Sequence, residues 1–155
     1  MSNPLWEFSV HNYARDGVAE SCLALQDGFG MDVNLLLYAA WVATADRSLS
    51  TEHLLALQAH IAPWRGRVVR PLRALRQEWR DYPVASAIRG KIKDLELLAE
   101  RQQQAMMLDF YHNAIELPAA KSPLQQNLQQ VAQLSCPGSD DWVGAIAGLT
   151  LVLRE

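Results

Sequence analysis

The chain has 155 residues, of which 50% are hydrophobic and 20% charged, and its formal net charge is −3. This balance excludes an intrinsically disordered chain, and the length suffices for one domain with a buried core. The two most apolar stretches, VNLLLYAAWVATA and WVGAIAGLTLVL, have 13 and 12 residues, whereas a membrane-spanning helix takes about 20.

The first residues and the two cysteines indicate a compartment. The opening MSNPLWEFSV has neither a basic start nor an uninterrupted apolar run, so we expect no signal peptide. Cys22 and Cys136 lie far apart in the sequence and match no metal-binding spacing. The sequence therefore predicts a cytoplasmic protein with two buried, reduced thiols.

Apolar residues at helical spacing predict a first helix from Leu5 to Arg15. Its inner face should include Phe8, Val10 and Tyr13. The helix is expected to break at the Asp-Gly pair that follows it, because that pair favours turns.

A second helix should begin with Asp16 as its N-cap and run through Gln26. The DGFG stretch that follows ends it, since glycine tolerates the left-handed backbone found at helix ends. Its inner face is predicted to carry Val18, Cys22 and Leu25.

The third helix, from Asp32 to about residue 45, is expected to be the structural centre. Asp32 precedes its apolar run and can accept the free N–H groups of the first turn. Because this helix is apolar almost all round, it should be the most buried element. A fourth helix is predicted after Ser50 and should end near Ile61.

A basic helix containing PWRGRVVRPLRALR comes next. Between Trp64 and Lys93 nine basic residues stand against two acidic ones. Pro71 has no N–H, so the helix should kink or restart there. Such a concentration of charge can form a surface for nucleic acid or an acidic partner, or it can pair with carboxylates of the same chain.

Three more helices complete the prediction. A long one should run from about Val84 to Ala114, followed by one over residues 122–134 and a last one from Trp142 to Leu153. No convincing strand pattern is present, so we predict a single all-α domain of six to eight helices around the helix at 32–45. The long helix is polar through ERQQQ and apolar at Leu95, Leu98, Met106 and Phe110, and Ser139 or Asp140 should cap the last helix.

The spacing of reactive side chains gives little support to catalysis or metal binding. His53 and His60 are about 10 Å apart along one helix, with no further ligand between them. Asp109 and His112 are three residues apart, but two ligands do not make a metal site. Cys22 falls on an apolar face without a basic neighbour, which predicts an inert thiol. We therefore predict no metal, no cofactor and no catalytic residue.

The strongest candidate for binding is a stripe of arginines on the basic helix. Steps of about 100° per residue bring four of them to one flank, where Trp64 can supply a stacking surface. A pI near 5.8 argues against general affinity for nucleic acid and favours an acidic protein or a small anionic ligand. The candidate binding residues are Trp64, Arg65, Arg73, Arg76 and Arg80.

The same arginines admit an internal role instead. They could form ion pairs with Glu96 or Glu100 of the long helix, or with the acids of the N-terminal hairpin. Arg76 lies nearest the apolar face of its helix, so its guanidinium is expected to reach an internal carboxylate. Arg73 and Arg80 point further from that face and should be freer.

Residues of the N-terminal half resemble a known family. They occur in LWEFSVHNYARDGVAESCLALQDGFGMDVNLLLYAAW and PWRGRVVRPLRALR. Together the two stretches are similar to a proteobacterial family of hypothetical proteins of comparable length and unknown function. The resemblance covers residues 5 to about 80 and implies no reaction, cofactor or catalytic residue.

The resemblance draws attention to one polar-aromatic cluster. Gln26, Asp32 and Asn34 surround a single turn of the chain, and aromatic residues stand nearby in the sequence. Buried amides need hydrogen-bond partners, so this cluster either locks the hairpin to the basic helix or lines a small pocket. The aromatic members are Trp6, Tyr13 and Trp41.

Two functions from different classes follow. The first is a cytoplasmic, non-enzymatic interaction or accessory protein that presents the arginine-rich flank to an acidic or anionic partner. The alternative is a small helical enzyme or ligand-binding protein that uses the polar-aromatic cluster, with an arginine to anchor an anion. The residues indicate neither the identity of the partner nor the oligomeric state.

Overall fold

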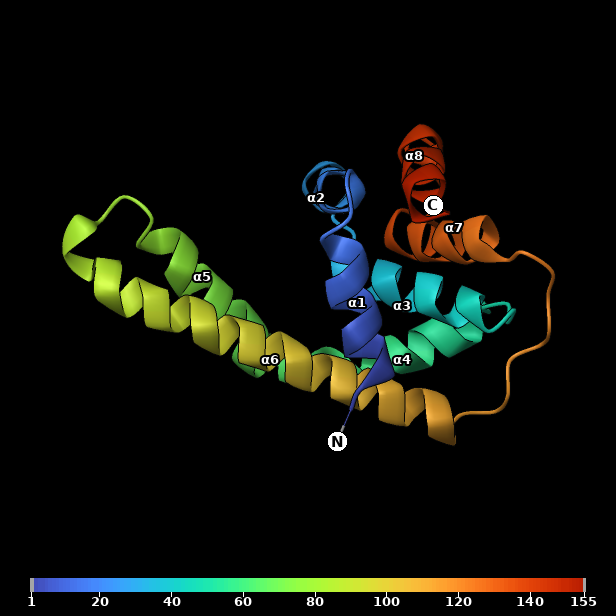
Figure 1. Cartoon of the computed structure of the whole chain (residues 1–155), viewed down its shortest axis with the longest axis horizontal. Helices are drawn as coiled ribbons and strands as arrows, with labels where there is room; N and C mark the ends of the chain where they lie inside the picture. The colour runs from blue at the N-terminus through green and yellow to red at the C-terminus, as the bar shows by residue number, and fades with distance from the viewer. Residues whose placement is uncertain (1, 155) are drawn as a thin grey trace. The chain divides into compact units, whose positions relative to one another are not determined.

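The computed structural model describes residues 2–154, and within them the chain is all-α, as predicted (Figure 1). Pairing of extended backbone in this range is limited to an isolated bridge between Arg47 and Ala119. The described residues form seven helices if the uninterrupted helical run Thr51–Glu78 is counted once and the short 3-10 helix Pro83–Ala85 is left aside.

The described chain forms two compact units. Unit 1 comprises residues 2–55 and 114–154, and unit 2 comprises residues 56–113. The division falls within one helix, α4 (Thr51–Trp64). The expectation of a single domain stays a prediction.

Unit 1 is built around α3 (Val33–Thr44), as the sequence predicted. In this unit α3 packs against α7 (Leu124–Ser135) and also contacts α1 (Pro4–Tyr13) and α2 (Val18–Phe29). The last helix, α8 (Val143–Leu153), packs against α2 and α7. Nine of the twelve residues of α3 are buried, which makes it the centre of this core.

The side chain of Asn127 on α7 joins the loop after α3 to the core of unit 1. Asn127 is fully buried, and its Nδ2 donates to the carbonyl oxygens of Arg47 at 2.9 Å and Ala39 at 3.3 Å. Its Oδ1 accepts the N–H of Leu49 at 2.9 Å. The oxygen and the nitrogen of this amide therefore both have hydrogen-bond partners, which offsets the free-energy cost of burying them.

The entry into α2 differs from the sequence prediction. The N-cap is Gly17 rather than Asp16, and no side-chain hydrogen bond caps this helix. Gly17 has φ of 85°, and a Cβ at this position would lie 3.1 Å from Cγ1 of Val152. The positive φ favours glycine and the close contact leaves little room for a side chain, so conformation and space set the start of this helix, not a capping carboxylate. The helix ends at Phe29, with Gly30 in the left-handed region.

Two further details of unit 1 were predicted wrongly. In α1 the residues that are buried beside Leu5 are Ser9 and Asn12, whereas Val10 is exposed. In α8 the N-cap is Trp142, with no side-chain cap, so neither of the two proposed polar residues caps this helix. Arg15 instead stabilises the other end of α8, donating to the carbonyls of Val152 at 2.9 Å and Leu153 at 3.4 Å.

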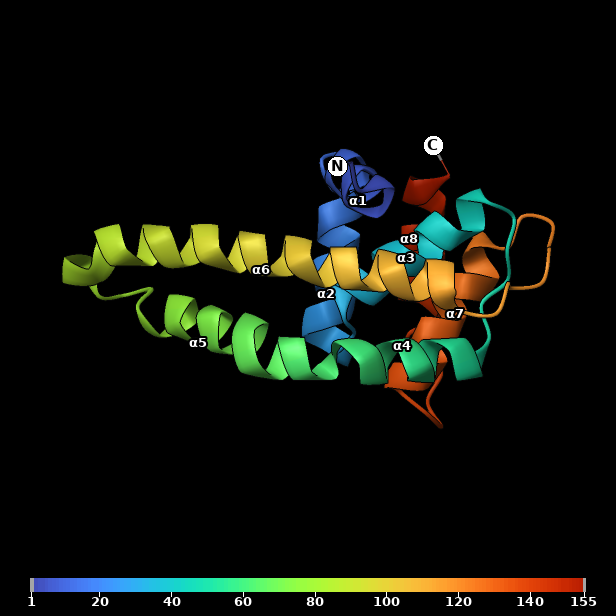
Figure 2. The same ribbon diagram turned by 90° about the horizontal axis from the view of Figure 1, so that it is seen from below.

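Unit 2 is an antiparallel helical hairpin. One arm is the end of α4, a π-helical turn η1 (Arg65–Val69) and α5 (Arg70–Glu78). After a short 3-10 turn, η2 (Pro83–Ala85), α6 (Ser86–Asn113) returns alongside α5, as Figure 2 shows. The fourth helix therefore does not stop near Ile61.

The π-helical turn has a cause in the sequence. Pro71 has no N–H to donate to the carbonyl four residues earlier. The helix widens ahead of it, and the N–H of Arg70 bonds to the carbonyl of Arg65 in a five-residue step. The predicted irregularity at Pro71 is thus confirmed, but it takes the form of a wider turn within a continuous helix.

The buried face of α6 contains several polar side chains. Glu96 and Gln103 are buried, together with the apolar Met107. Leu95 and Leu98, two of the apolar positions noted in the sequence, are exposed at 48% and 61%. The covered face of this helix therefore combines charges and amides with apolar residues.

Among residues 2–154, no helix combines the length and the apolar character needed to cross a membrane.

Candidate interaction surface and its polar network

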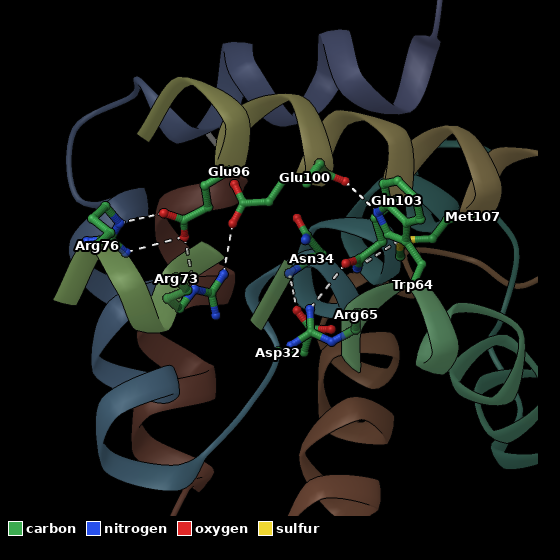
Figure 3. A network of polar contacts seen from close by, with 11 residues as sticks. Asp32, Asn34, Trp64, Arg65, Arg73, Arg76, Glu96, Glu100, Gln103 and Met107 are labelled. Atoms are coloured by element: carbon green, nitrogen blue, oxygen red, sulfur yellow. Dashed lines mark hydrogen bonds and ion pairs between the residues drawn. The ribbon is translucent and has the colours of Figure 1, made fainter. Parts of the chain in front are cut away.

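The centre of the basic hairpin is a network of two carboxylates and two guanidinium groups. Glu96 and Glu100 lie one turn apart on α6 and reach toward Arg73 and Arg76 of α5 (Figure 3). Arg73 donates to Glu96 at 3.1 Å and to Glu100 at 2.8 Å. Arg76 donates to both oxygens of Glu96, through Nε and, at 3.3 Å, through Nη2. One carboxylate is thus held by two arginines.

Burial and the neighbouring arginines shift the pKa of Glu96 in opposite directions. Burial by itself would raise the pKa of this carboxyl, because it disfavours the charged form. The hydrogen bonds and positive charges of Arg76 and Arg73 outweigh burial and bring the pKa of Glu96 below its ordinary value. For Arg73, burial would lower the pKa, but the two carboxylates raise it. Glu96 and Arg73 are therefore both charged at neutral pH.

The end of α5 nearest the turn is held by another arginine. Nε of Arg89, on α6, donates to the carbonyl oxygen of Arg76 at 2.8 Å. Carbonyl groups in the last turn of a helix lack hydrogen-bond partners within that helix. A positive charge there also interacts favourably with the negative end of the helix dipole. Arg89 therefore serves as a C-terminal cap for α5.

The other end of the hairpin is joined by hydrogen bonds whose acceptors are neutral. Nε1 of Trp64 donates to the carbonyl oxygen of Ala99 at 2.8 Å, and Arg65 donates to Oε1 of Gln103 at 3.3 Å. Gln103 also contacts the sulfur of Met107 through Nε2. Because its N–H is held against α6, Trp64 acts as a structural anchor of the hairpin.

The structure divides the five predicted binding residues into two groups. Four of them make internal contacts in unit 2: Trp64, Arg65, Arg73 and Arg76. The expectation that Arg76 reaches an internal carboxylate is confirmed. The expectation that Arg73 is freer is wrong, because its long side chain extends past the neighbouring turn to two carboxylates.

Arg80 is exposed, as expected, and two arginines that the sequence did not single out share this property. Arg67 and Arg70 are exposed on η1 and at the start of α5. Within residues 2–154 no side-chain hydrogen bond or ion pair is found for any of the three. They are called the free arginines below.

The sequence indicated the partners in this network but not their register. Glu96 and Glu100 are acids of the long helix, and they were expected as partners of the arginines if those had an internal role. A turn at residues 79–85 would by itself place Arg76 opposite residue 88, whereas the structure pairs it with Glu96. The position of the turn therefore did not suffice to predict the pairing.

The alternative polar-aromatic site belongs to unit 1, and part of it has a structural role. Asp32 is the N-cap of α3, as predicted, and its Oδ1 accepts the N–H of Asn34 at 2.9 Å. Gln26 lies in the last turn of α2, where its carbonyl oxygen accepts the N–H of Gly30 at 3.0 Å. These contacts order the turn between the two helices.

The aromatic members of that cluster are half-buried. Trp6 lies near the start of α1 and Tyr13 ends it. Trp41 lies in α3, with its ring centroid 6.2 Å from that of the buried Tyr38. A pocket formed by this cluster stays a prediction.

The other reactive side chains have structural surroundings. Cys22 is buried and not in a disulfide, as predicted, and burial raises the pKa of its thiol to about 12. Cys136 is also not in a disulfide, but it is half-buried rather than buried as expected. His53 is buried, and its Nε2 lies 2.7 Å from the hydroxyl of Tyr38. Burial lowers the pKa of His53, so the ring is neutral at pH 7. Within residues 2–154 no group of three potential metal ligands is present.

Comparison with protein families gives one match. The family described as "Protein of unknown function (DUF2390)" matches residues 4–107, two thirds of the chain. The chain belongs to this family. The matched DUF2390 region includes the whole polar network and extends further than the resemblance over residues 5 to about 80. Curated proteins gave no match, and neither did solved structures.

Proposed function

We propose that this member of the DUF2390 family is a cytoplasmic, non-enzymatic accessory protein that binds an acidic protein partner through the basic hairpin of unit 2. Arg67, Arg70 and Arg80 make the contact. Arg73 and Arg76 hold the two helices together, which keeps the free arginines on a fixed frame.

The observation that supports this most is the charge left over after internal pairing. Unit 2 has ten Lys and Arg residues against six Asp and Glu residues, a net charge of +4, although the whole chain carries −3. Glu96 and Glu100 are committed to Arg73 and Arg76. The exposed cations therefore have few carboxylates of their own hairpin to neutralise them, and a separate concentration of positive charge attracts acidic partners.

The test removes the free arginines together. The variant Arg67→Ala/Arg70→Ala/Arg80→Ala should bind immobilised poly-glutamate much more weakly than the wild type at low salt. Wild-type binding should itself weaken as salt is added, because exposed charges are screened over about 8–10 Å. The melting temperature should change little, since these side chains are exposed and have no partner.

A matched control removes exposed cations from unit 1. Lys121→Ala/Arg154→Ala lowers the net charge without touching the hairpin, and it should retain binding. If the hairpin variant and this control lost equal affinity, attraction would depend on total charge alone, and the proposed surface would be wrong.

A further inference from the structure

The outer face of α6 has the composition expected of a buried face. Ile88, Leu95 and Leu98 are exposed at 58%, 48% and 61%. On the same helix Glu96 and Gln103 are buried. Soluble proteins rarely leave contiguous large apolar residues in water while burying charged ones, unless another molecule covers the apolar face.

The three apolar residues share one side of the helix. They are separated by seven and then three residues, which is the spacing of the seam in a pair of packed helices. Lys91 and Gln102 occupy the remaining positions of this seam, before and after the two leucines. We call these five positions the leucine stripe. Leu95 is turned about 100° from Glu96, so the stripe is separate from the face that packs on α5.

We propose that the leucine stripe of α6 pairs with the same stripe of a second copy of this chain, in antiparallel orientation, to form a two-fold symmetric dimer. Symmetric self-association is the commonest form of assembly for soluble proteins, and a two-fold interface requires one patch to complement itself. The leucine stripe meets that requirement.

The polar members of the stripe determine the direction of pairing. With an axis between Leu95 and Leu98, each Leu95 lies opposite Leu98 of the second copy. Lys91 then lies opposite Gln102, an amide that can accept from the ammonium group. A parallel pair would instead place Lys91 against Lys91 of the second copy, and like charges in that position destabilise helix pairing.

The charges beside the stripe also fit the antiparallel pair. Asp94 and Arg101 are seven residues apart and lie on the same flank of α6. In the antiparallel register Asp94 of each copy comes next to Arg101 of the other. The guanidinium has five N–H donors and can hold this carboxylate in addition to contacts within its own chain.

Sedimentation equilibrium of the full chain over a wide concentration range tests the proposal. The wild type should be a dimer, and Leu95→Asp/Leu98→Asp should raise the dissociation constant at least about a hundredfold, because four leucines leave the interface. Leu97→Asp is the matched control, since Leu97 is exposed at 54% on another side of the helix. It should leave the dimer intact, and circular dichroism should show the same helical content for all three proteins.

A charge exchange tests the orientation. Asp94→Arg should weaken the dimer, and the double variant Asp94→Arg/Arg101→Asp should restore it, since each pair is then reversed. A wild type that stays monomeric at every concentration overturns the proposal, and so does a dimer that survives the Leu95→Asp/Leu98→Asp change. Failure of the double variant to recover would exclude the antiparallel register.

Discussion

In unit 1 the central helix α3 is buried on nearly every side among apolar residues, whereas in unit 2 the two arms of the hairpin meet through carboxylates, guanidinium groups and amides. Apolar packing is non-directional and depends on volume. Ion pairs and amide bonds depend on geometry and on the presence of both partners. The two units should therefore respond to different kinds of substitution.

The largest effect is expected in the apolar core. Leu36 is buried in α3, so Leu36→Ala should destabilise the protein by about 2–5 kcal/mol, through lost burial and the cavity left behind. Denaturant unfolding monitored by circular dichroism measures this. Leu23→Ala, at a residue of α2 that is exposed at 42%, is the control and should cost far less. Equal losses would mean that α3 is not the centre of the core.

A somewhat smaller effect is expected from the polar network. Glu96→Ala leaves Arg73 and Arg76 facing each other without the carboxylate that both bind, and it should cost about 2–3 kcal/mol, less than a fully buried pair because the arginines keep some contact with water. Arg80→Ala should cost close to zero, as expected of an exposed charge without a partner.

The same network gives a dependence on pH with a definite sign. Because the folded-state pKa of Glu96 is lowered, its contribution is present above the ordinary carboxyl value of 4.5 and is lost as the pH falls through the folded value. Glu96→Gln should be less stable than the wild type at neutral pH, and this difference in the free energy of unfolding should become smaller in acid. A deficit that stays constant down to low pH would show that the charge of Glu96 does not stabilise the hairpin.

This contrast also explains which parts of the fold could be predicted. Periodicity identifies residues that share a helix face, and it was sufficient for Cys22 in α2 and for α3 as a whole, where the apolar face is the covered one. It does not say which face a neighbour will cover. In α6 the neighbour α5 presents arginines, so Glu96 is buried and Leu95 is not.

The candidate site was predictable only in part for the same reason. A helical wheel gives the direction of the Cα–Cβ bond, but it ignores the reach of a long side chain, and Arg73 extends to Glu100 from a flank position. The π-helical turn at Arg65–Val69 also changes the angle between Arg65 and the arginines beyond it. The wheel assumed a regular helix, so Arg65 was grouped with residues whose contacts it does not share.

A smaller effect is expected at the start of α3, where the sequence prediction was right. Asp32→Ala should cost about 1 kcal/mol, because the N–H of Asn34 loses the carboxylate that caps it. Asp16→Ala is the matched control at the start of α2, where the carboxylate does not cap the helix, and it should be nearly neutral. If the two variants lost equal stability, the capping role assigned to Asp32 would be unsupported.

The smallest effect on the free energy of unfolding is expected from protonation of His53. This effect is absent at neutral pH and appears only in acid. Burial lowers the folded-state pKa of His53 below the ordinary value of 6.5, and so the unfolded chain takes up the proton first as the pH falls. The free energy of unfolding should then decrease from about pH 6.5 downward and level off below the folded-state pKa of His53.

His53→Gln should remove this slope, because an amide can bond to the Tyr38 hydroxyl but does not titrate in this range. His11→Gln, at an exposed position of α1, should retain it. Urea unfolding of the three proteins at several pH values measures the slopes, and an unchanged slope in His53→Gln would assign the acid sensitivity to another group.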